Sequence, residues 1–235
     1  MYSDHEKNYD FEQSWDIIAD SFDKTRSRPW NICLDFINNI SPDAYVIDIG
    51  CGNGRHLIPC AKRCRLAIGL DISRRLLSIA QKKSKDEKIS NTLFIHGNAT
   101  NIPLKDNSVD VAIYIATLHT IKGRDKRIDS LLELKRILKP YGQALISVWS
   151  RYQSRFLPRI IKSFFTRRED EFGDTIVYWR QNNLNTPRFY HLYSKHEFIK
   201  DIRDAGLCIV TIKPARFYSK ILHDNYFIII QKKTE

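Results

Sequence analysis

The chain of 235 residues has the size of one domain with elaborations, and its 43% hydrophobic residues can supply a core. No apolar run approaches the roughly 20 residues of a membrane span. Residues 1–6 lack the basic-then-apolar pattern of a signal peptide, so we expect a cytoplasmic protein. The formal charge of +11 is uneven, because residues 151–235 carry 16 basic and 9 acidic residues, against 22 and 18 in residues 1–150. This excess predicts an anionic partner, of which nucleic acid is the commonest large one, or else a solvated basic face.

Two helices are predicted in an N-terminal helical region, residues 1–44. The first carries its apolar residues on one face, which we expect to pack over the core (Phe11, Trp15, Ile18, Ala19 and Phe22). Pro29 suits the first turn of the second helix, whose apolar stripe runs through residues 30–40. Arg26 and Arg28 therefore fall in a short loop between the helices. A helical lid over a pocket would bring both arginines near a substrate; otherwise they are surface residues.

A buried strand over residues 45–48 leads into three alternate glycines and a helix over 55–62. The strand ends in Asp48. The glycines at 50, 52 and 54 remove every Cβ from a turn that opens onto a helix N-terminus, where a ligand can touch backbone. A dinucleotide fingerprint would need its third glycine at the position of Arg55. The pattern D-x-G-x-G-x-G after a strand instead resembles motif I of the class I S-adenosylmethionine (SAM) methyltransferases.

A second apolar strand, residues 66–70, ends in Asp71, about 20 residues beyond the glycine turn, the offset at which a carboxylate meets ribose hydroxyls. The alternative is a glycine-rich turn with a capping aspartate and no cofactor. Asn98 follows the third strand, where SAM enzymes often have an Asp that accepts from the adenine amino group, and its amide oxygen could accept the same bond. The expected cofactor contacts are Asp48, Gly50, Gly52, Asn53, Gly54, Asp71, Ile72, Asn98, Ala99 and Ile115.

Strands and helices alternate through residues 45–150, the predicted cofactor-binding core. Further strands are expected over 92–95, 109–115 and 143–148, with helices over 74–84 (after a Ser73 cap) and 125–138 (ending before Pro140). Residues 194–235 add a helix over 195–205, begun by a Ser194–Glu197 capping box, and an antiparallel hairpin of strands 207–212 and 226–231. The chain is therefore predicted to be one α/β, Rossmann-like domain over residues 1–235, with a mostly parallel seven-stranded sheet.

Residues 151–193 form a predicted basic and aromatic insertion between the fifth strand and the last helix. From Arg151 to Arg168 there are six basic residues, four aromatic residues and no acid. This composition suits phosphate contacts and base stacking, although a helix with a basic solvent face would explain it too. Short aromatic strands are expected over 177–180 and 188–193. His119 stands at the carboxyl end of the fourth strand, where it either meets a substrate or is structural.

Several segments outside the cofactor motif resemble the Trm9-type tRNA wobble-uridine methyltransferases, the family shared with the methyltransferase domain of the human AlkB homologue 8. They are T-R-x-x-P-W at residues 25–30, I-A-T-L-H at 115–119, V-W-x-x-x-Q at 148–153 and R-F-Y-H-L-Y at 188–193. The resemblance runs from about His5 to the C-terminus. Two positions depart from the family pattern: Thr120 stands where a second His is common, and Asn98 replaces the usual Asp.

The resemblance implies a class I SAM methyltransferase that methylates the carboxylate of 5-carboxymethyluridine at tRNA position 34, giving 5-methoxycarbonylmethyluridine. It also implies a Trm112-like small zinc-binding activator, docked by strand addition on an edge strand at Thr92–Ile95. Arg26 and His119 would be the catalytic residues. The residues expected to bind the substrate are Arg28, Trp149, Arg151, Arg188, Tyr190 and His191. The last three of these would grip the tRNA anticodon loop.

Two alternatives are open at this stage. One is a SAM-dependent methyltransferase of a small molecule of the quinone or sterol type, which gives no reason for the basic insertion. The other is a tRNA-binding module with a vestigial cofactor pocket, against which the intact Asp48 and Asp71 argue. The five cysteines predict small buried thiols rather than a metal site of the protein itself.

Overall fold

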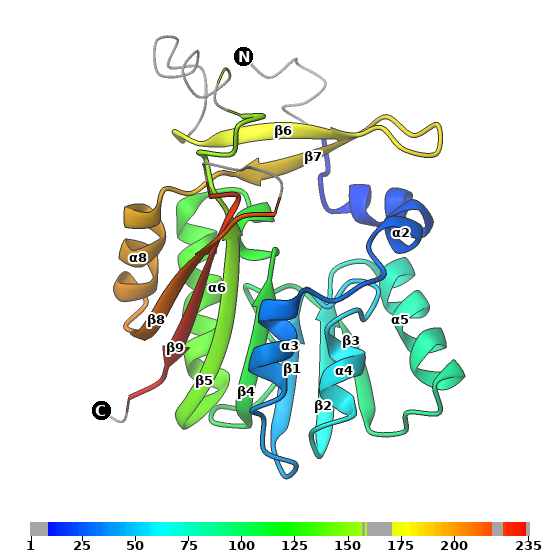
Figure 1. Ribbon diagram of the computed structural model, residues 1–235, viewed down its shortest axis with the longest axis vertical. Coiled ribbons are helices and arrows are strands. Elements are labelled where there is room, and N and C mark those ends of the chain that lie inside the picture. The colour runs from blue at the N-terminus through cyan, green and yellow to red at the C-terminus, as the bar shows by residue number, and fades with distance from the viewer. Residues whose placement is uncertain (1–8, 157, 159–170, 218–222, 234–235) are drawn as a thin grey trace.

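The computed structural model describes residues 9–156, 158, 171–217 and 223–233 (Figure 1). Seven strands form one sheet in the order β3-β2-β1-β4-β5-β9-β8. Neighbouring strands from β3 to β5 pair in parallel, whereas β9 is antiparallel to both β5 and β8. The strands are β1 (Tyr45–Ile49), β2 (Leu66–Asp71), β3 (Thr92–His96), β4 (Val109–Ile115), β5 (Leu138–Trp149), β8 (Cys208–Ala215) and β9 (Asn225–Gln231). The predicted fold class is confirmed.

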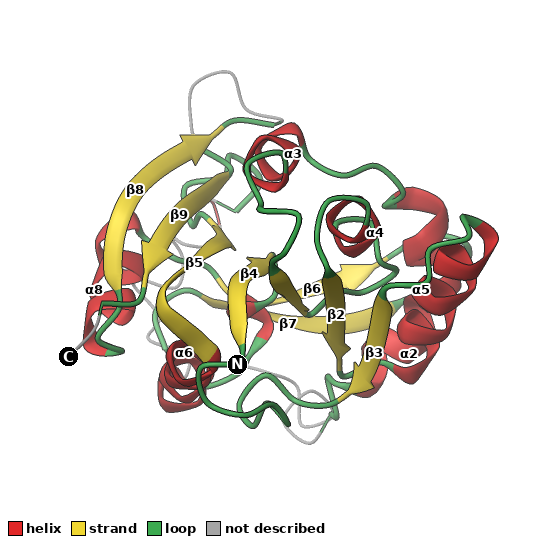
Figure 2. Cartoon of the chain, turned by 90° about the horizontal axis from the view of Figure 1, so that it is seen from below, coloured by secondary structure: helices red, strands yellow, loops and turns green. Residues whose placement is uncertain are grey.

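Helices cover both faces of this sheet, with α3, α4 and α5 on one face and α6 and α8 on the other (Figure 2). Because successive strand residues point to opposite faces, β1 sends Ile47 and Ile49 into the core with α6 and α8, and Val46 into the core with α3 and α4. No helix in the described ranges combines the length and the apolar run that a membrane crossing needs. The helices are α2 (Gln13–Thr25), α3 (Asn31–Ile37), α4 (Leu57–Ala61), α5 (Arg74–Asp86), α6 (Arg124–Ile137) and α8 (Lys195–Asp204), with a 3-10 turn, η1, at Leu118–Thr120.

Two helices are shorter than predicted. α4 begins at Leu57 rather than at residue 55, because the glycine turn continues through Arg55 and His56. α3 begins after Trp30 and ends at Ile37, so the last part of its apolar stripe packs from a turn. The period of the apolar residues therefore locates both helices but overstates their length.

β5 begins earlier than predicted, directly after α6. Leu138 pairs with Val109, and the register then shifts so that Gln143 pairs with Val111. The residues between them bulge out of the ladder. Pro140 lies in this bulge, where the missing backbone N–H of proline costs no ladder hydrogen bond.

The insertion crosses the carboxyl end of the sheet as an antiparallel hairpin of β6 (Asp174–Trp179) and β7 (Thr186–His191), above the strands in Figure 1. These strands contain most of the two aromatic segments predicted from the sequence. Four basic residues of the predicted run lie outside the described residues: Arg159, Lys162, Arg167 and Arg168.

The insertion leaves and re-enters the core at adjacent points. Ser150 and Tyr193 form an isolated parallel bridge. Arg151 N donates to Tyr193 O over 2.9 Å, and Tyr193 N donates to Trp149 O over 3.0 Å. The hairpin therefore stands on a hydrogen-bonded base at the end of β5.

The turn after β1 depends on glycine at position 50. Gly50 has a φ of +71°, and a Cβ at this position would lie 2.2 Å from Thr117 Oγ1 in the loop after β4. We expect Gly50→Ala to lower the free energy of unfolding, measured by urea denaturation, by at least about 3 kcal/mol, because left-handed backbone strain and a steric clash add. Gly206→Ala is the control, since Gly206 has a φ of +69° and its Cβ would meet only the flexible end of Lys135. That variant should lose about 1–2 kcal/mol, and equal losses in the two variants would contradict the clash.

Candidate active site

A cavity of about 940 Å³ opens at the carboxyl ends of β1, β2 and β4 and is lined in part by the β6–β7 hairpin. β1 and β4 are neighbours in the sheet although two strands separate them in the sequence, so the connections leave them in opposite directions and open a crevice. The loops after β1, β2 and β3 form one end of the cavity wall. The hairpin, the end of β5 and part of α2 form the other end.

The glycine turn uses its own backbone donors internally. Gly50 N and Cys51 N donate to Leu70 O over 2.7 and 3.0 Å, and Gly52 N donates to Asp71 Oδ2 over 2.7 Å. These three N–H groups are therefore not aimed at a ligand, as they would be in a cradle for pyrophosphate. The wall instead offers a ligand the carboxylate of Asp71, which suits a diol.

The two acids of the cofactor motif are buried. Asp71 is fixed by Gly52 N and by Ser73 N, which donates to Oδ1 over 2.8 Å. Burial raises the pKa of Asp71 to about 6 and that of Asp48 to about 7, and repulsion from Asp71 adds to the shift at Asp48. Asp71 lines the cavity, whereas Asp48 lies behind the turn with Oδ2 lacking a hydrogen-bond partner among the described residues.

Asn53 presents an unsatisfied acceptor in the cavity wall. Its Nδ2 donates to Asp23 Oδ1 over 2.7 Å and to Arg26 O over 3.2 Å. Its Oδ1 is buried and has no partner within the described part of the chain. A ligand donor such as an amino-acid ammonium group would satisfy this oxygen. Asn53 and Asp71 together fit the amino-acid and ribose parts of SAM.

Asn98 lines the same end of the cavity, but its oxygen already has partners. Oδ1 accepts from Thr100 N and from Thr100 Oγ1, each over 3.0 Å. Nδ2 faces Glu12 Oε1 at 3.4 Å. An adenine amino group would therefore have to share the Asn98 oxygen with Thr100, a contact the sequence does not reveal.

Two stacked rings form part of the wall at the other end. Trp149 and Tyr190 lie with ring centroids 4.4 Å apart and planes 1° apart. His119 lies against both, with centroid distances of 5.3 and 5.5 Å, and is fully buried. Trp149 and Tyr190 thus line the cavity, whereas His119 packs against them without lining it.

The buried His119 ring is neutral. Trp149 N donates to Nδ1 over 3.4 Å, so Nε2 carries the ring proton, and Nε2 has no partner within the described residues. Burial, followed by the positive charges of His191 and Arg188, lowers the pKa of His119 to about 3. His119 therefore carries no charge at physiological pH.

Arginine side chains lie over the aromatic rings of this end. Arg26 and Arg188 lie over Trp179, at 5.4 and 4.8 Å from its ring centroid, and Arg155 lies over Trp149 at 4.7 Å. Such cation–π contacts attract the guanidinium charge to the ring. The wall therefore combines fixed positive charge with stacking surface.

The cavity gathers twelve of the residues predicted from the sequence, and six lie elsewhere. Those that line it are Arg26, Gly50, Gly52, Asn53, Asp71, Ile72, Asn98, Ala99, Ile115, Trp149, Arg188 and Tyr190. Those outside its wall are Arg28, which is exposed, and Asp48, Gly54, His119, Arg151 and His191, which are buried. The roles assigned to these residues stay predictions.

The sequence did not single out several residues of the wall. Trp15 lies on α2, whose aromatic face was expected to pack over the core, and Arg188 lies over its ring at 5.6 Å. Trp179 and Arg155 belong to the insertion, and Thr117 belongs to the loop before His119. The mixture of basic and aromatic residues was the available signal for the insertion, but nothing in the sequence ranks them individually.

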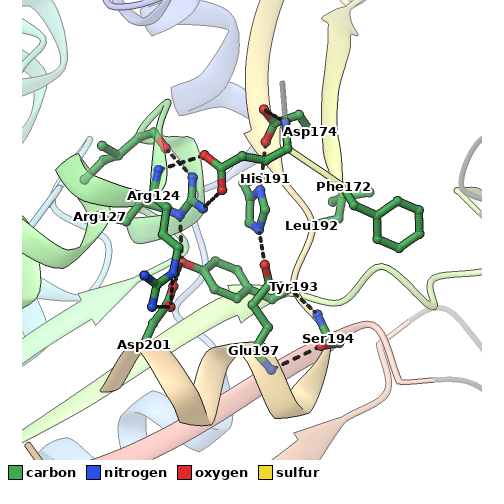
Figure 3. Close-up of polar contacts among 12 residues, drawn as sticks. Arg124, Arg127, Phe172, Asp174, His191, Leu192, Tyr193, Ser194, Glu197 and Asp201 are labelled. Atoms are coloured by element: carbon green, nitrogen blue, oxygen red, sulfur yellow. Dashed lines mark hydrogen bonds and ion pairs between the residues drawn. The ribbon is translucent and has the colours of Figure 1, made fainter. Parts of the chain in front are cut away.

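His191, at the end of β7, points away from the cavity and enters a buried polar network that joins the hairpin to α8 (Figure 3). His191 bridges two carboxylates, with Nδ1 at 2.7 Å from Asp174 Oδ1 and Nε2 at 2.9 Å from Glu197 Oε1. Glu197 also pairs with Arg151. His191 and Arg151 thus bind the foot of the hairpin to the first turn of α8.

A second part of the network reaches α6. Arg127 is fully buried, donates to Tyr193 Oη over 2.9 Å and pairs with Glu171 at 2.7 Å. Tyr193 Oη donates to Asp201 Oδ2 over 3.1 Å. Removing one partner of such a buried pair typically costs about 3–5 kcal/mol. The network therefore fixes β7, and with it the position of Arg188 and Tyr190 in the cavity wall.

The two carboxylates beside His191 predict a pH-dependent stability. Burial alone lowers the pKa of His191 and Arg127 opposes its charge, but hydrogen bonds with Asp174 and Glu197 outweigh both and raise the pKa above its usual value. The imidazolium therefore stabilises the fold fully below about pH 6.5, and this contribution is lost as the pH rises through the raised pKa. We expect the difference in free energy of unfolding between the wild type and His191→Gln to shrink from about pH 6 to about pH 9 in urea denaturation.

His196→Gln is the control for removal of an exposed imidazole, because His196 is exposed on α8, the helix to which His191 is bound through Glu197. The change with pH should be larger for His191→Gln than for His196→Gln. A difference for His191→Gln that does not shrink would mean that the fold does not raise the pKa of His191.

Comparison with known proteins places this geometry in context. A family model described as a methyltransferase domain matches residues 47–146. The chain is 33% identical over 141 residues to the mouse tRNA (carboxymethyluridine(34)-5-O)-methyltransferase ALKBH8. The aligned region covers 60% of this chain and 20% of the mouse protein. It is 25% identical over 245 residues to the Schizosaccharomyces pombe tRNA (carboxymethyluridine(34)-5-O)-methyltransferase, which covers 99% of this chain and 100% of that protein. The chain spans about a fifth to a third of the length of its relatives from mouse, Xenopus tropicalis and Arabidopsis thaliana.

Solved structures share the fold. A SAM-dependent methyltransferase from Methanosarcina mazei superposes with a TM-score of 0.74 at 20% identity, over 88% of this chain and 100% of that one. A chain from the complex between the Haloferax volcanii Trm112 methyltransferase activator and a putative methyltransferase superposes with a TM-score of 0.69 at 17% identity, over 96% of this chain and 99% of that one. The resemblance drawn from the sequence segments is confirmed. The chain is similar in sequence to the tRNA (carboxymethyluridine(34)-5-O)-methyltransferases of several organisms, and it has the fold of the SAM-dependent methyltransferases.

Proposed function

We propose that the chain is a SAM-dependent tRNA methyltransferase that esterifies the carboxylate of 5-carboxymethyluridine at wobble position 34, in complex with a Trm112-like activator. One observation carries the proposal: an acceptor-lined end and an arginine- and aromatic-lined end belong to the same cavity. A methyl donor bound at Asp71 and Asn53 would share this space with an anionic, ring-bearing substrate held near Arg26 and Trp149.

The substrate end favours an RNA base over an apolar small molecule. Trp149 and Tyr190 offer a stacking surface, and Arg26 and Arg188 place positive charge beside it. Unstacked bases in an anticodon loop are recognised by aromatic stacking and by arginine contacts. The relatives named for the wobble-uridine reaction support the same substrate.

The reaction asks little of acid–base chemistry. A carboxylate with a pKa near 4 is already ionised at neutral pH, so it needs no general base. SAM, when bound, supplies the methyl group of its sulfonium. The residues of the chain therefore have to bind, orient and exclude water. Arg26 would pair with the carboxylate or a neighbouring phosphate through its planar fork, and the hairpin would cover the crevice.

Several predicted residues act through their neighbours in this scheme. A neutral, buried His119 would orient the uracil by keeping the Trp149 and Tyr190 rings in place. Arg188 and Tyr190 would grip the anticodon loop, while His191 and Arg151 hold the strand that carries them.

The partner would bind at the edge of the sheet. β3 is an edge strand, as predicted for Thr92–Ile95, and Leu93 on it is 46% exposed. An unpaired edge can take up a strand from another chain. The Haloferax volcanii methyltransferase, whose complex contains the Trm112 activator, has this fold.

Arg26→Ala should lower kcat about 10- to 100-fold, because lost hydrogen bonds to a charged group are worth about 1.5–3 kcal/mol. SAM affinity, measured by calorimetry, should persist. Arg74→Ala, an exposed position on α5, is the control for lost positive charge and should leave both values unchanged. Loss of SAM binding in Arg26→Ala would mean that Arg26 serves the cofactor instead.

The proposed reaction is tested by incubating the chain with labelled SAM and tRNA that carries 5-carboxymethyluridine, with and without a Trm112-type partner. Mass spectrometry of the nucleosides should find the methyl ester at the wobble position, in larger amount with the partner. Label at another nucleoside would keep an RNA methyltransferase but reject the wobble assignment. Bound SAM without transfer to any tRNA would favour a small-molecule methyltransferase.

Leu93→Lys should reduce copurification with a Trm112-type partner, because a charge on an edge strand opposes strand addition. Leu132→Lys on α6 is the control, since Leu132 is 45% exposed and lies away from that edge. Equal recovery of the partner with both variants would place the interface elsewhere.

A further inference from the structure

The α2 helix is bound on one side to the loops of the cofactor end. Asp16 Oδ1 accepts from Ser73 Oγ over 2.5 Å and from Arg75 N over 3.0 Å, and Ser73 N in turn donates to Asp71. Asp23 accepts from Asn53 Nδ2 over 2.7 Å. Asp16 and Asp23 of α2 thus contact residues that orient the cofactor end of the cavity.

The same helix is bound on its other side to the β6–β7 hairpin, and Figure 1 shows it between the hairpin and α5. Ser14 Oγ donates to Pro187 O over 2.7 Å. Ser21 Oγ accepts from Trp179 Nε1 over 2.7 Å and from Asn182 Nδ2 over 2.8 Å. Ser14 and Ser21 are both buried, so these bonds are shielded from competition with water.

We propose that α2 couples the two ends of the cavity, with Ser14 and Ser21 as positioning residues that transmit the order of the cofactor loops to the hairpin. A cofactor that orders the glycine turn and the start of α5 stabilises α2 through Asn53 and Ser73. The helix then stabilises the hairpin strands that carry Trp179 and Arg188. Linkage makes the effect reciprocal, so a ligand at the hairpin favours cofactor binding by the same factor.

This coupling rests on the cofactor part of the proposed function and not on the identity of the substrate. It is separable from direct contact between cofactor and hairpin, because Ser14 and Ser21 lie outside the cavity wall. Substituting either serine removes a bond between α2 and the hairpin without replacing a residue that lines the cavity.

The test is hydrogen–deuterium exchange of the full chain with and without S-adenosylhomocysteine. In the wild type we expect slower exchange in the cofactor loops and, by at least about fivefold, in the backbone amides of β6 and β7. In Ser21→Ala and Ser14→Ala the cofactor loops should still be protected, while the added protection of the hairpin falls below about twofold. Ser27→Ala, in the exposed loop after α2, is the matched control and should behave as the wild type.

Hairpin protection that is absent in the wild type, or unchanged in both variants, would overturn the coupling alone. Cofactor loops that are not protected in the wild type would contradict the cofactor site itself, and the coupling with it. As a second measurement, S-adenosylhomocysteine should tighten tRNA binding by about the same factor in the wild type and in Ser27→Ala. Ser14→Ala and Ser21→Ala should bind tRNA equally tightly with and without S-adenosylhomocysteine.

Discussion

The close approach of two loops sets the floor of the cavity. The turn after β1 and the loop after β4 meet at Gly50 and Thr117 with no room for a side chain at position 50. Because the two strands are neighbours at the point where the sheet order reverses, this contact lies where the crevice opens. Hydrogen bonds to Leu70 and Asp71, at the end of β2, fix the conformation of the turn after β1. The shape of the cavity end that would hold the cofactor thus depends on the carboxyl ends of three parallel strands, β1, β2 and β4.

A strongly positive chain is not the same as a strongly positive surface. Arg127 and Arg151 are buried, and both pair with carboxylates that bind the insertion to the helices. Along β7 the side chains alternate, so Arg188 and Tyr190 face the cavity while His191 faces the buried network. The charge of the insertion therefore divides between recognition and internal support, and the pleat of one strand makes the division.

Short-range sequence patterns predicted most of the secondary structure of the core. The strand at 109–115, the Ser73 cap and the Ser194–Glu197 capping box appear in the structure as the sequence indicated, because each depends on residues a few positions apart. The pairing of β6 with β7 and its path across the sheet were not predictable, since they depend on contacts between distant segments.

The site residues follow the same rule. Gly50, Asn53 and Asp71 came from a local motif and line the cavity. His119 came from its place at the end of a strand and from the resemblance, and His191 came from the resemblance. The burial of both depends on rings and carboxylates supplied by other elements. A histidine that touches a ligand and one that supports its neighbours look alike in a sequence.

The bridge between Ser150 and Tyr193 has an evolutionary consequence. Since the insertion begins and ends at one point, the parts of it outside the buried network with α6 and α8 can change in length and sequence without moving the strands on which the cofactor end depends. A duplication, deletion or exchange in those parts would change the hairpin and the substrate end of the cavity and would leave the sheet largely unchanged. An ancestral methyltransferase could therefore acquire a new class of acceptor by replacing a single closed segment of chain.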